Sequence, residues 1–389
     1  MLDPHINADV IIVGLGAVGS ALVLHLARQG VKVVGIDRFD PPHDQGSSHG
    51  RTRITRLAVG EGEAFVPLVQ RSHALWRRFE AETGERLMQT TGLLVVGAPA
   101  GDTAAYHGQA GFFARTRSIA QRFGIEHEML SPAAVRERFP AFLPGDDEHA
   151  YYEPEGGVLF PETCIRVQLM LAERAGARLL RRCRMQGVTP EGDGVAVQTD
   201  AGVLRAGRAV LCTGAWLPGQ AAALPRLRVL RQVLHWVEPE VPAWFDAGAF
   251  PAFLWLHGPD ASDAFYGFPR VDGQAGVKLA TEQFTQLSDP DHVDRTVAPA
   301  VEQALLDDHV AGRLRGLAPR VLTSTTCLYT MADDGNFVIA PHPDTERITL
   351  VSACSGHGFK HSAALGESLA QHITGQPTRC DLGSFIAPR

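Results

Sequence analysis

The N-terminal part of the chain alternates apolar runs with a helical pattern. Residues 8–14 (ADVIIVG) form a β-branched apolar run, which is typical of a strand buried on both faces of a parallel sheet. Residues 20–29 place their leucines on one face at helical spacing, and residues 31–37 (VKVVGID) form a second apolar run. This order predicts a strand, a helix and a second strand, which together make one βαβ unit.

Apolar periodicity continues to the C-terminus without an internal repeat. It predicts helices at residues 66–82, 161–175, 299–314 and 360–373, and a mostly helical stretch at 103–138. It predicts strands at residues 92–97, 194–199, 202–205, 209–213, 231–238, 338–340 and 348–353, with further strands up to residue 280. Because no Gly/Ser-rich linker marks a boundary, we expect domains that are interleaved along the chain.

Residues 39–53 fit neither a helix nor a strand. They are rich in Pro, His, Gly and Ser, and a loop of this length inside a compact domain is usually functional. The loop and the residues just after it carry His43, His49, Arg51, Arg53 and Arg56. These side chains either run along a bound cofactor or form an ordinary solvated loop, and the pattern alone leaves both interpretations open.

Composition narrows the class of protein. Of 389 residues, 45% are hydrophobic and 20% are charged, so the chain can bury a large core. With 36 Lys and Arg against 43 Asp and Glu, the net charge of −7 argues against a nucleic-acid partner. No run approaches the roughly 20 apolar residues of a membrane helix, and the N-terminus lacks a signal-peptide pattern. The 6 Cys form no Cys-x-x-Cys pair, so neither a metal site nor a disulfide framework is expected. We expect a soluble, cytoplasmic protein with reduced thiols and no membrane partner.

A glycine-rich turn joins the first predicted strand to its helix. Gly14, Gly16 and Gly19 form G-x-G-x-x-G, whose glycines allow a tight turn, close approach of a pyrophosphate and close helix–strand packing. The start of the helix offers N–H groups to the phosphates. Asp37 ends the second strand, 18 residues after Gly19. At this position a carboxylate can accept hydrogen bonds from the hydroxyl groups of a ribose. The motif predicts dinucleotide binding and leaves FAD and NAD both open, so an NAD-dependent dehydrogenase remains an alternative.

Four motifs together resemble one family of flavoproteins. They are residues 40–56 (DPPHDQGSSHGRTRITR), 266–269 (YGFP), 327–330 (CLYT) and 355–360 (SGHGFK). In this order and spacing they resemble the monomeric sarcosine oxidase and N-methyltryptophan oxidase family, within the D-amino-acid-oxidase-like flavoproteins. The resemblance extends over nearly the whole chain and is much more specific than the glycine turn.

The resemblance implies a fold of class α/β + β. A Rossmann-like FAD-binding domain is expected from residues 1–90, 152–232 and 320–389. A second, mostly antiparallel-sheet substrate domain is expected from residues 91–151 and 233–319.

The resemblance also implies FAD bound covalently, through the sulfur of Cys327 to the 8α-methyl group of the flavin. Gly356 and Gly358 of the SGHGFK motif are expected to border the cofactor. Without the motif around it, a single cysteine is more often an inert buried residue.

Residues at the substrate end follow from the same resemblance. Arg56 and Lys360 match the pair that binds the substrate carboxylate, for which a guanidinium fork and an ammonium point charge are suited. Tyr266 and Tyr329 match aromatic residues that line the substrate cavity. The ordinary alternatives are a structural ion pair at Arg56, an exposed lysine at Lys360 and two core tyrosines.

Three further residues match positions at the flavin ring. His49 and Arg53 are expected beside the ring, and Lys278 matches the lysine that holds a water near flavin N5 and promotes reaction with oxygen. A cation there would stabilise developing negative charge. Lys278 alternates with Val277 and Leu279, so it faces away from them, and the sequence leaves open whether that face meets solvent or flavin.

One position departs from the sarcosine-type pattern. Members of that type have a histidine four residues after the active-site lysine, where this chain has Glu282. In a strand, Lys278 and Glu282 would share a face about 13 Å apart at roughly 3.3 Å per residue, so both can border one elongated pocket. The acid casts doubt on sarcosine and favours a cyclic imino acid, although Glu282 can also turn to solvent.

We therefore expect an oxidase of a secondary amine that bears a carboxylate. The substrate would be an N-methyl amino acid or, as the alternative, a cyclic imino acid such as proline, pipecolate or a dehydro-relative. Hydride would pass to flavin N5 and O2 would be reduced to H2O2. The expected partners are this small molecule and O2, with no metal and with a monomeric state, and a flavin-binding protein without turnover is a further alternative.

Overall fold

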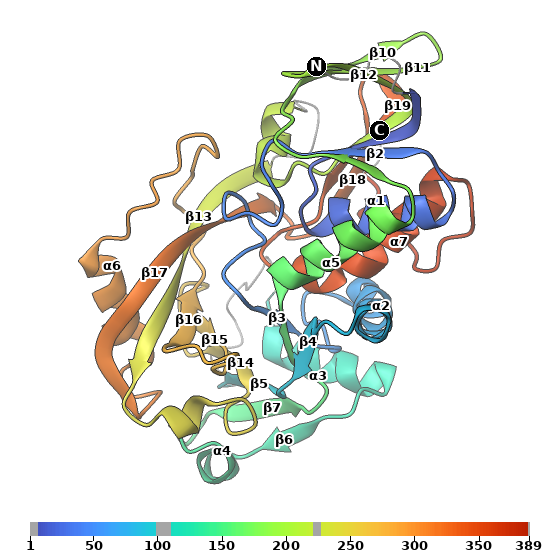
Figure 1. Ribbon diagram of the computed structural model, residues 1–389. Coiled ribbons are helices and arrows are strands. Elements are labelled where there is room, and N and C mark those ends of the chain that lie inside the picture. Colours follow the sequence, from blue (N-terminus) through green and yellow to red (C-terminus); the bar gives the residue numbers. More distant parts are fainter. Residues whose placement is uncertain (1–6, 99–109, 221–226, 388–389) are drawn as a thin grey trace.

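The computed structural model describes residues 7–98, 110–220 and 227–387 (Figure 1). Part of the predicted helical stretch, residues 103–109, lies outside the described residues. The rest of that stretch contains α3 (Phe112–Phe123), β6 (Glu128–Leu130) and α4 (Pro132–Arg138), so it is mostly helical as predicted.

The predicted βαβ unit lies inside the first sheet. It consists of β1 (Asn7–Val13), α1 (Ala17–Arg28) and β2 (Val33–Ile36). The sheet runs β10–β11–β12–β1–β2–β9, with β19 paired to β12 and β18 paired to β19. Its other strands are β9 (Arg178–Leu180), β10 (Met185–Glu191), β11 (Gly194–Thr199), β12 (Gly202–Leu211), β18 (Val338–His342) and β19 (Thr345–Ser352).

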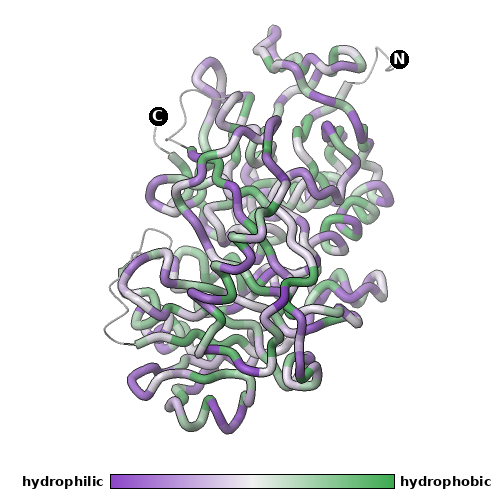
Figure 2. Tube along the Cα trace, turned by 90° about the vertical axis from the view of Figure 1, so that its left-hand side faces the viewer, coloured by the Kyte–Doolittle hydropathy of each residue, from purple (hydrophilic) through white to green (hydrophobic). Residues whose placement is uncertain are grey.

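Strand β1 is apolar along its length because both of its faces are covered. It pairs in parallel with β2 on one side and with β12 on the other. Val10 and Ile12 belong to one hydrophobic core, whereas Ile11 and Val13 belong to the core on the opposite face of the sheet. The tube in Figure 2 shows hydrophobic segments running through the interior and hydrophilic ones mostly in outer turns.

Helices α1, α5 (Pro161–Arg174) and α7 (Ser362–Ile373) lie side by side against the first sheet (Figure 1). Helix α2 (Val66–Thr83) packs on α7, and the predicted helices at 66–82, 161–175 and 360–373 are confirmed by α2, α5 and α7. Helices α1 and α7 approach closely, since a Cβ atom on Gly366 would lie 2.4 Å from the Cβ atom of Ala21.

A second sheet has the order β17–β13–β16–β15–β14–β5–β7–β6 and is antiparallel except for the β5–β14 pair. The long strands β13 and β17 run side by side in Figure 1. A small third sheet has the order β3–β8–β4. The two large sheets confirm the predicted α/β + β fold class. The remaining strands are β3 (Arg53–Thr55), β4 (Met88–Thr90), β5 (Leu93–Gly97), β7 (His149–Glu153), β8 (Gly157–Leu159), β13 (Leu227–Pro239), β14 (Ala252–Leu256), β15 (Ala264–Gly267), β16 (Val277–Thr281) and β17 (Leu317–Ala332).

Three element predictions were wrong. The two strands expected at 202–205 and 209–213 are one strand, β12, because its first half pairs with β11 and its second half with β1 and β19. The helix expected at 299–314 is α6 (Pro299–Ala304) followed by a π-helical turn at Leu305–Val310. Strand β17 was not predicted, because its first half is largely exposed and therefore lacks an apolar pattern.

The domain borders are best placed between the sheets. The expected borders at residues 151, 232 and 319 fall inside β7, β13 and β17, and all three strands belong to the second sheet. We propose that each strand belongs wholly to the substrate domain, because a sheet that shares one core folds as a unit.

Candidate cofactor and substrate site

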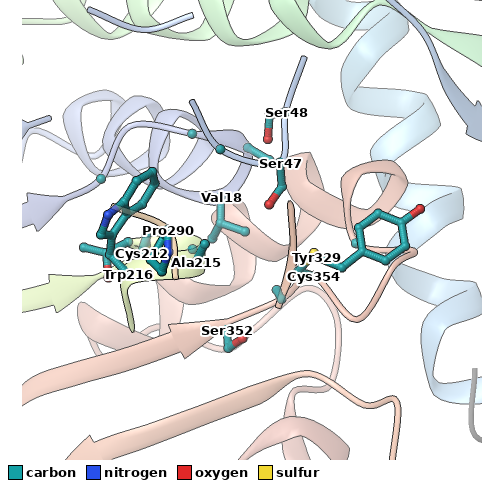
Figure 3. Close-up of a pocket in the computed structure, with 18 of the residues that line it drawn as sticks. Val18, Ser47, Ser48, Cys212, Ala215, Trp216, Pro290, Tyr329, Ser352 and Cys354 are labelled. Carbon is teal, nitrogen blue, oxygen red and sulfur yellow. The ribbon is translucent and has the colours of Figure 1, made fainter. Parts of the chain in front are cut away.

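A cavity of about 1100 Å³ is lined by residues from both large sheets. It extends from the glycine turn after β1, past the loop that follows β2, to Tyr266 and Tyr329 of the second sheet and to Glu282, which directly follows β16. Ligand pockets usually measure roughly 300–1,000 Å³, so this cavity can hold a dinucleotide together with a small second molecule. In Figure 3, Trp216 and Pro290 lie at one end of the view and Tyr329 and Cys354 at the other, with Ser47 and Ser48 between them.

The glycine turn leaves open space at the start of α1, where a Cβ atom on Gly16 would meet nothing within 4 Å. Gly14 has a positive φ of 90°, and a Cβ atom on Gly19 would lie 1.8 Å from the Gly14 carbonyl oxygen. Gly16 is the N-cap residue of α1 and has no side chain. No capping side chain therefore accepts a hydrogen bond from the first N–H groups of the helix. Gly14 and Gly16 line the cavity. This arrangement fits a pyrophosphate at the positive end of the helix.

Asp37 lies at the end of β2 and also lines the cavity. Its two carboxylate oxygens accept the backbone N–H groups of Leu15 and Phe39, each at 2.8 Å. The carboxylate thereby ties the glycine turn to the start of the following loop. Each oxygen keeps a second lone pair, so a ribose hydroxyl can still donate to it.

The loop expected to be functional contains no helix or strand between β2 and β3. Eight of its residues line the cavity: Phe39, Pro41, Pro42, His43, Gly46, Ser47, Ser48 and Arg53. The SGHGFK motif contributes Gly356, Gly358 and Lys360 to the same cavity. The two motifs are more than 300 residues apart in sequence and face one binding space.

Cys327 lies directly behind the cavity wall. Its side chain is buried, with Sγ 3.5 Å from the Ser47 carbonyl oxygen and 3.6 Å from Arg53 Nη2. Ser47 and Arg53 line the cavity, whereas Cys327 does not. Burial raises the pKa of the thiol, and the positive charge of Arg53 opposes that rise. Three other thiols line the cavity and were not singled out from the sequence: Cys183, Cys212 and Cys354.

His49 and Lys278 are buried beside Arg53 rather than on the cavity surface. Lys278 Nζ donates to the carbonyl oxygens of Gly50 and Thr52, both at 2.8 Å. The face of β16 opposite Val277 is therefore interior, which the sequence had left open. Burial, reinforced by Arg53, lowers the pKa of His49 to about 3, so this imidazole is neutral near pH 7. Burial and Arg53 also lower the pKa of Lys278 well below its usual range.

Arg56 and Lys360 converge on an acid that was not predicted. Arg56 Nη2 lies 2.5 Å from Glu61 Oε2, and Lys360 Nζ lies 3.6 Å from Glu61 Oε1. All three side chains are buried and line the cavity. Arg56 Nε has no hydrogen-bond partner among the described residues, so a buried donor is left for an anion. The sequence signal for Glu61 is its position between two glycines, five residues after Arg56.

Two tyrosines and Glu282 form a hydrogen-bonded chain along the cavity. The Tyr266 and Tyr329 hydroxyls are 3.4 Å apart, and the Tyr329 hydroxyl donates to Glu282 Oε1 at 3.3 Å. Burial raises the pKa of both tyrosines, and the Glu282 carboxylate adds to it. Glu282 is only 5% exposed and lines the cavity, so it does not turn to solvent. Lys278 does not share this pocket surface, because its ammonium group turns toward residues 50–52.

We also searched the described ranges 7–98, 110–220 and 227–387 for metal sites, membrane-spanning helices and disulfides. No group of His, Cys, Asp and Glu side chains there could hold a metal ion. None of the helices described is both long and apolar enough to cross a membrane. All six cysteines lie in the described ranges and are free.

Comparison with known protein families identifies the class of protein to which this fold and cavity belong. The family model described as FAD dependent oxidoreductase matches residues 9–372, which is most of the chain. The protein is therefore an FAD-dependent oxidoreductase, and the open choice between FAD and NAD is decided for FAD.

Relatives narrow this class further. The chain is 36% identical to monomeric sarcosine oxidase from Streptomyces avermitilis over 382 residues, covering 97% of this chain and 96% of that protein. It is 33% identical to N-methyl-L-tryptophan oxidase from Yersinia pestis over 384 residues, covering 98% and 99%. The chain therefore belongs to the family of monomeric sarcosine oxidase and N-methyl-L-tryptophan oxidase.

Solved structures support the fold. NikD, described as an unusual amino acid oxidase essential for nikkomycin biosynthesis, superposes with a TM-score of 0.83 at 22% identity, covering 98% of this chain and 97% of that one. At this identity the likeness concerns the fold alone.

Proposed function

We propose that the protein is an FAD-dependent oxidase of a secondary amine that bears a carboxylate, such as an N-methyl amino acid. The observation that carries the proposal is the pair of buried cations, Arg56 and Lys360, on the cavity that begins at the glycine turn. A dinucleotide at the turn would leave this cationic end for an acidic substrate. The relatives named for N-methyl amino acid substrates favour the same chemistry.

The residues present fit FAD as the cofactor. The Gly14–Gly16–Gly19 turn would hold the pyrophosphate, Asp37 the ribose, and the loop carrying Ser47 would face the ring system. When bound, FAD would accept the substrate hydride at N5 and pass two electrons to O2, giving H2O2. Cys327 is the residue we propose for a thioether to the flavin 8α-methyl group.

The carboxylate would be held between Arg56 and Lys360. In the structure Glu61 pairs with both cations, so an incoming carboxylate has to replace part of this internal pairing. Arg56 Nε would donate to the substrate from the start, because no described group accepts from it. Two cations facing one carboxylate fix the orientation of the substrate in the cavity.

The substrate amine has to be neutral to give up hydride. The buried cations Arg53, Arg56 and Lys360 lower the pKa of a nearby amine by charge repulsion, whereas Glu282 opposes that shift. No separate general base is required in this scheme. Arg53 lines the cavity and would stabilise negative charge that develops on reduced oxygen, whereas Lys278, predicted for the same role, lies behind the wall and donates to Gly50 and Thr52.

A pH dependence follows from Lys360. Burial, reinforced by the positive charge of Arg56, lowers the pKa of Lys360 from 10.5 to about 8. A lysine is charged below its pKa, so this cation is present at pH 7 and is lost as the pH rises through about 8. We expect the affinity for an amine-free carboxylate such as acetate to fall roughly tenfold or more as Lys360 is neutralised.

The measurement is a titration of the flavin absorption spectrum with acetate at several pH values. Lys360→Arg serves as the control, because a guanidinium stays charged over this range and the profile should become flat. A wild-type affinity that does not change across pH 8 would contradict the assignment of Lys360.

The proposed activity is tested with a panel of amino and imino acids. We expect O2 consumption and H2O2 with N-methyl amino acids, and one formaldehyde for each H2O2, because the oxidised N-methyl group leaves after hydrolysis of the imine. Primary amino acids and carboxylate-free amines serve as controls. The proposal fails if no carboxylate-bearing secondary amine reduces the flavin under anaerobic conditions, which would leave a flavoprotein without this turnover.

A cyclic imino acid such as proline, pipecolate or a dehydro-relative is the second candidate. Glu282 favours it, because the carboxylate lies on the cavity where sarcosine-type relatives are expected to have histidine. The same panel of substrates distinguishes the two candidates, because oxidation of a cyclic imino acid gives H2O2 without formaldehyde. We also propose a monomer, in keeping with the name of the sarcosine oxidase relatives.

A further inference from the structure

A fully buried carboxylate of the second sheet holds a turn at the edge of the cavity. Glu153, the last residue of β7, has no exposed surface. Its carboxylate accepts the backbone N–H groups of Leu57 and Ala58, the latter at 3.0 Å, and the Tyr151 hydroxyl at 2.9 Å. Burying a carboxylate is unfavourable unless donors replace the lost water. The two backbone donors therefore tie β7 firmly to this turn.

The turn connects the two charged residues of the anion site. Residues 57–60 lie between Arg56 and Glu61, and the chain reverses so that these two side chains meet at 2.5 Å. Leu57 and Ala58 directly follow Arg56, and each peptide unit is planar. Fixing the N–H groups of residues 57 and 58 therefore limits the directions in which the Arg56 side chain can point.

The opposite side of the turn is closed by α3. A Cβ atom on Gly60 would lie 2.4 Å from Thr116 Oγ1 and 2.9 Å from Phe112 Cε2. The Arg56 guanidinium lies over the Phe112 ring at 5.0 Å from its centre. The turn is thus held between Glu153 on one side and α3 on the other, without room to move toward the helix.

We propose that Glu153 is a positioning residue for substrate binding, which aims Arg56 at the cavity by holding the turn at residues 57–58. The inference rests on the proposed function, in which Arg56 binds the substrate carboxylate. Glu153 itself is not part of the cavity wall and touches neither the cofactor space nor the substrate space. A glutamine at 153 has only one accepting oxygen, so its NH2 group would face a backbone N–H and the turn would have to shift.

The test uses Glu153→Gln as holoenzyme, with acetate binding followed by the flavin absorption spectrum. We expect acetate to bind roughly tenfold more weakly, and the KM for the amino acid substrate to rise by a similar factor with little change in kcat. The matched control is Glu148→Gln. Glu148 immediately precedes β7 and accepts the indole N–H of Trp255 at 2.7 Å, and acetate affinity should be unchanged in this variant.

A purely structural role of Glu153 has a different signature. Thermal stability would fall in both variants while acetate affinity in Glu153→Gln stayed within about twofold of wild type, and this result overturns the inference. If Glu153→Gln does not accumulate as holoenzyme, Glu153→Asp is titrated in its place. It keeps the charge but retracts the carboxylate from the turn, so weaker acetate binding supports the inference and unchanged binding overturns it.

Acetate binding by Arg56→Lys separates the role of Arg56 in carboxylate binding from the positioning role of Glu153. Unchanged acetate binding in Arg56→Lys would remove the proposed role of Arg56 in binding the substrate carboxylate. Weaker binding in Arg56→Lys together with unchanged binding in Glu153→Gln would remove only the positioning role.

Discussion

In the wild-type protein we expect the flavin to stay attached in acid. Replacing Cys327 with alanine is expected to let acid release it. The Cys327 Sγ atom lies 3.5 Å from the carbonyl oxygen of Ser47, a residue of the cavity wall. Arg53 Nη2 lies 3.6 Å from the same sulfur, and its charge opposes the rise in thiol pKa that burial causes. Arg53 therefore limits, without cancelling, the loss of the reactive thiolate that burial causes.

Acid precipitation provides the measurement. In the wild-type protein the yellow colour should stay with the pellet, and in Cys327→Ala it should move entirely to the supernatant, with flavin also lost on prolonged dialysis. The matched control is Cys354→Ala. This thiol lines the cavity itself, yet lies outside the CLYT motif, so its removal should leave the colour in the pellet.

Two results would contradict the assignment. A wild-type pellet without colour would show that the flavin is not covalently bound. Release of flavin by Cys354→Ala but not by Cys327→Ala would transfer the attachment to the thiol at 354. Mass spectrometry of the flavin peptide distinguishes the two sulfurs directly.

Replacing Arg56 with lysine is expected to lower kcat/KM for the amino acid substrate by roughly 30-fold or more. Truncating one partner of a buried, hydrogen-bonded charge pair costs about 2–5 kcal/mol, and each 1.4 kcal/mol is tenfold in affinity. A lysine keeps the charge but loses the planar fork and the free Nε donor. Most of the loss should therefore lie in KM.

The control for Arg56 is a second arginine that pairs with a glutamate away from the cavity. Arg71 forms a bidentate pair with Glu367 at 2.6–2.7 Å and lies outside the cavity wall. Arg71→Lys should leave KM unchanged. A KM in Arg56→Lys within about twofold of wild type, with an unaltered flavin spectrum, would show that the carboxylate binds elsewhere.

Much of the fold could be predicted from local pattern. The βαβ unit was recognisable because β1 is covered on both faces, so Val10, Ile11, Ile12 and Val13 are all apolar. Helices α2 and α5 were recognisable because each buries mainly one face, and α7 because it is apolar and buried over most of its length. Strand β17 was not, because its exposed half carries no alternation and its pairing with β13 involves residues about 90 positions apart.

The candidate site was predicted to a similar extent. The motifs contained Arg56, Lys360, Tyr266, Tyr329 and Glu282, and the structure brings all five to one cavity. Glu61 and Glu153 were missed. A single glutamate in sequence resembles any surface acid, and its burial beside a cation depends on contacts with distant elements.

The amino-acid sequence by itself determined the elements and the chemistry available to this protein. Periodicity defines which faces must be buried, and the glycine turn carries its own backbone requirement, so both are local properties of the chain. Only the tertiary structure decided which charges meet. Glu61 pairs with both Arg56 and Lys360, Lys278 turns toward residues 50–52, and Cys327 lies one layer behind the cavity wall. These outcomes depend on distances between segments that are far apart in sequence, and electrostatic and hydrogen-bond energies change steeply over a few ångströms.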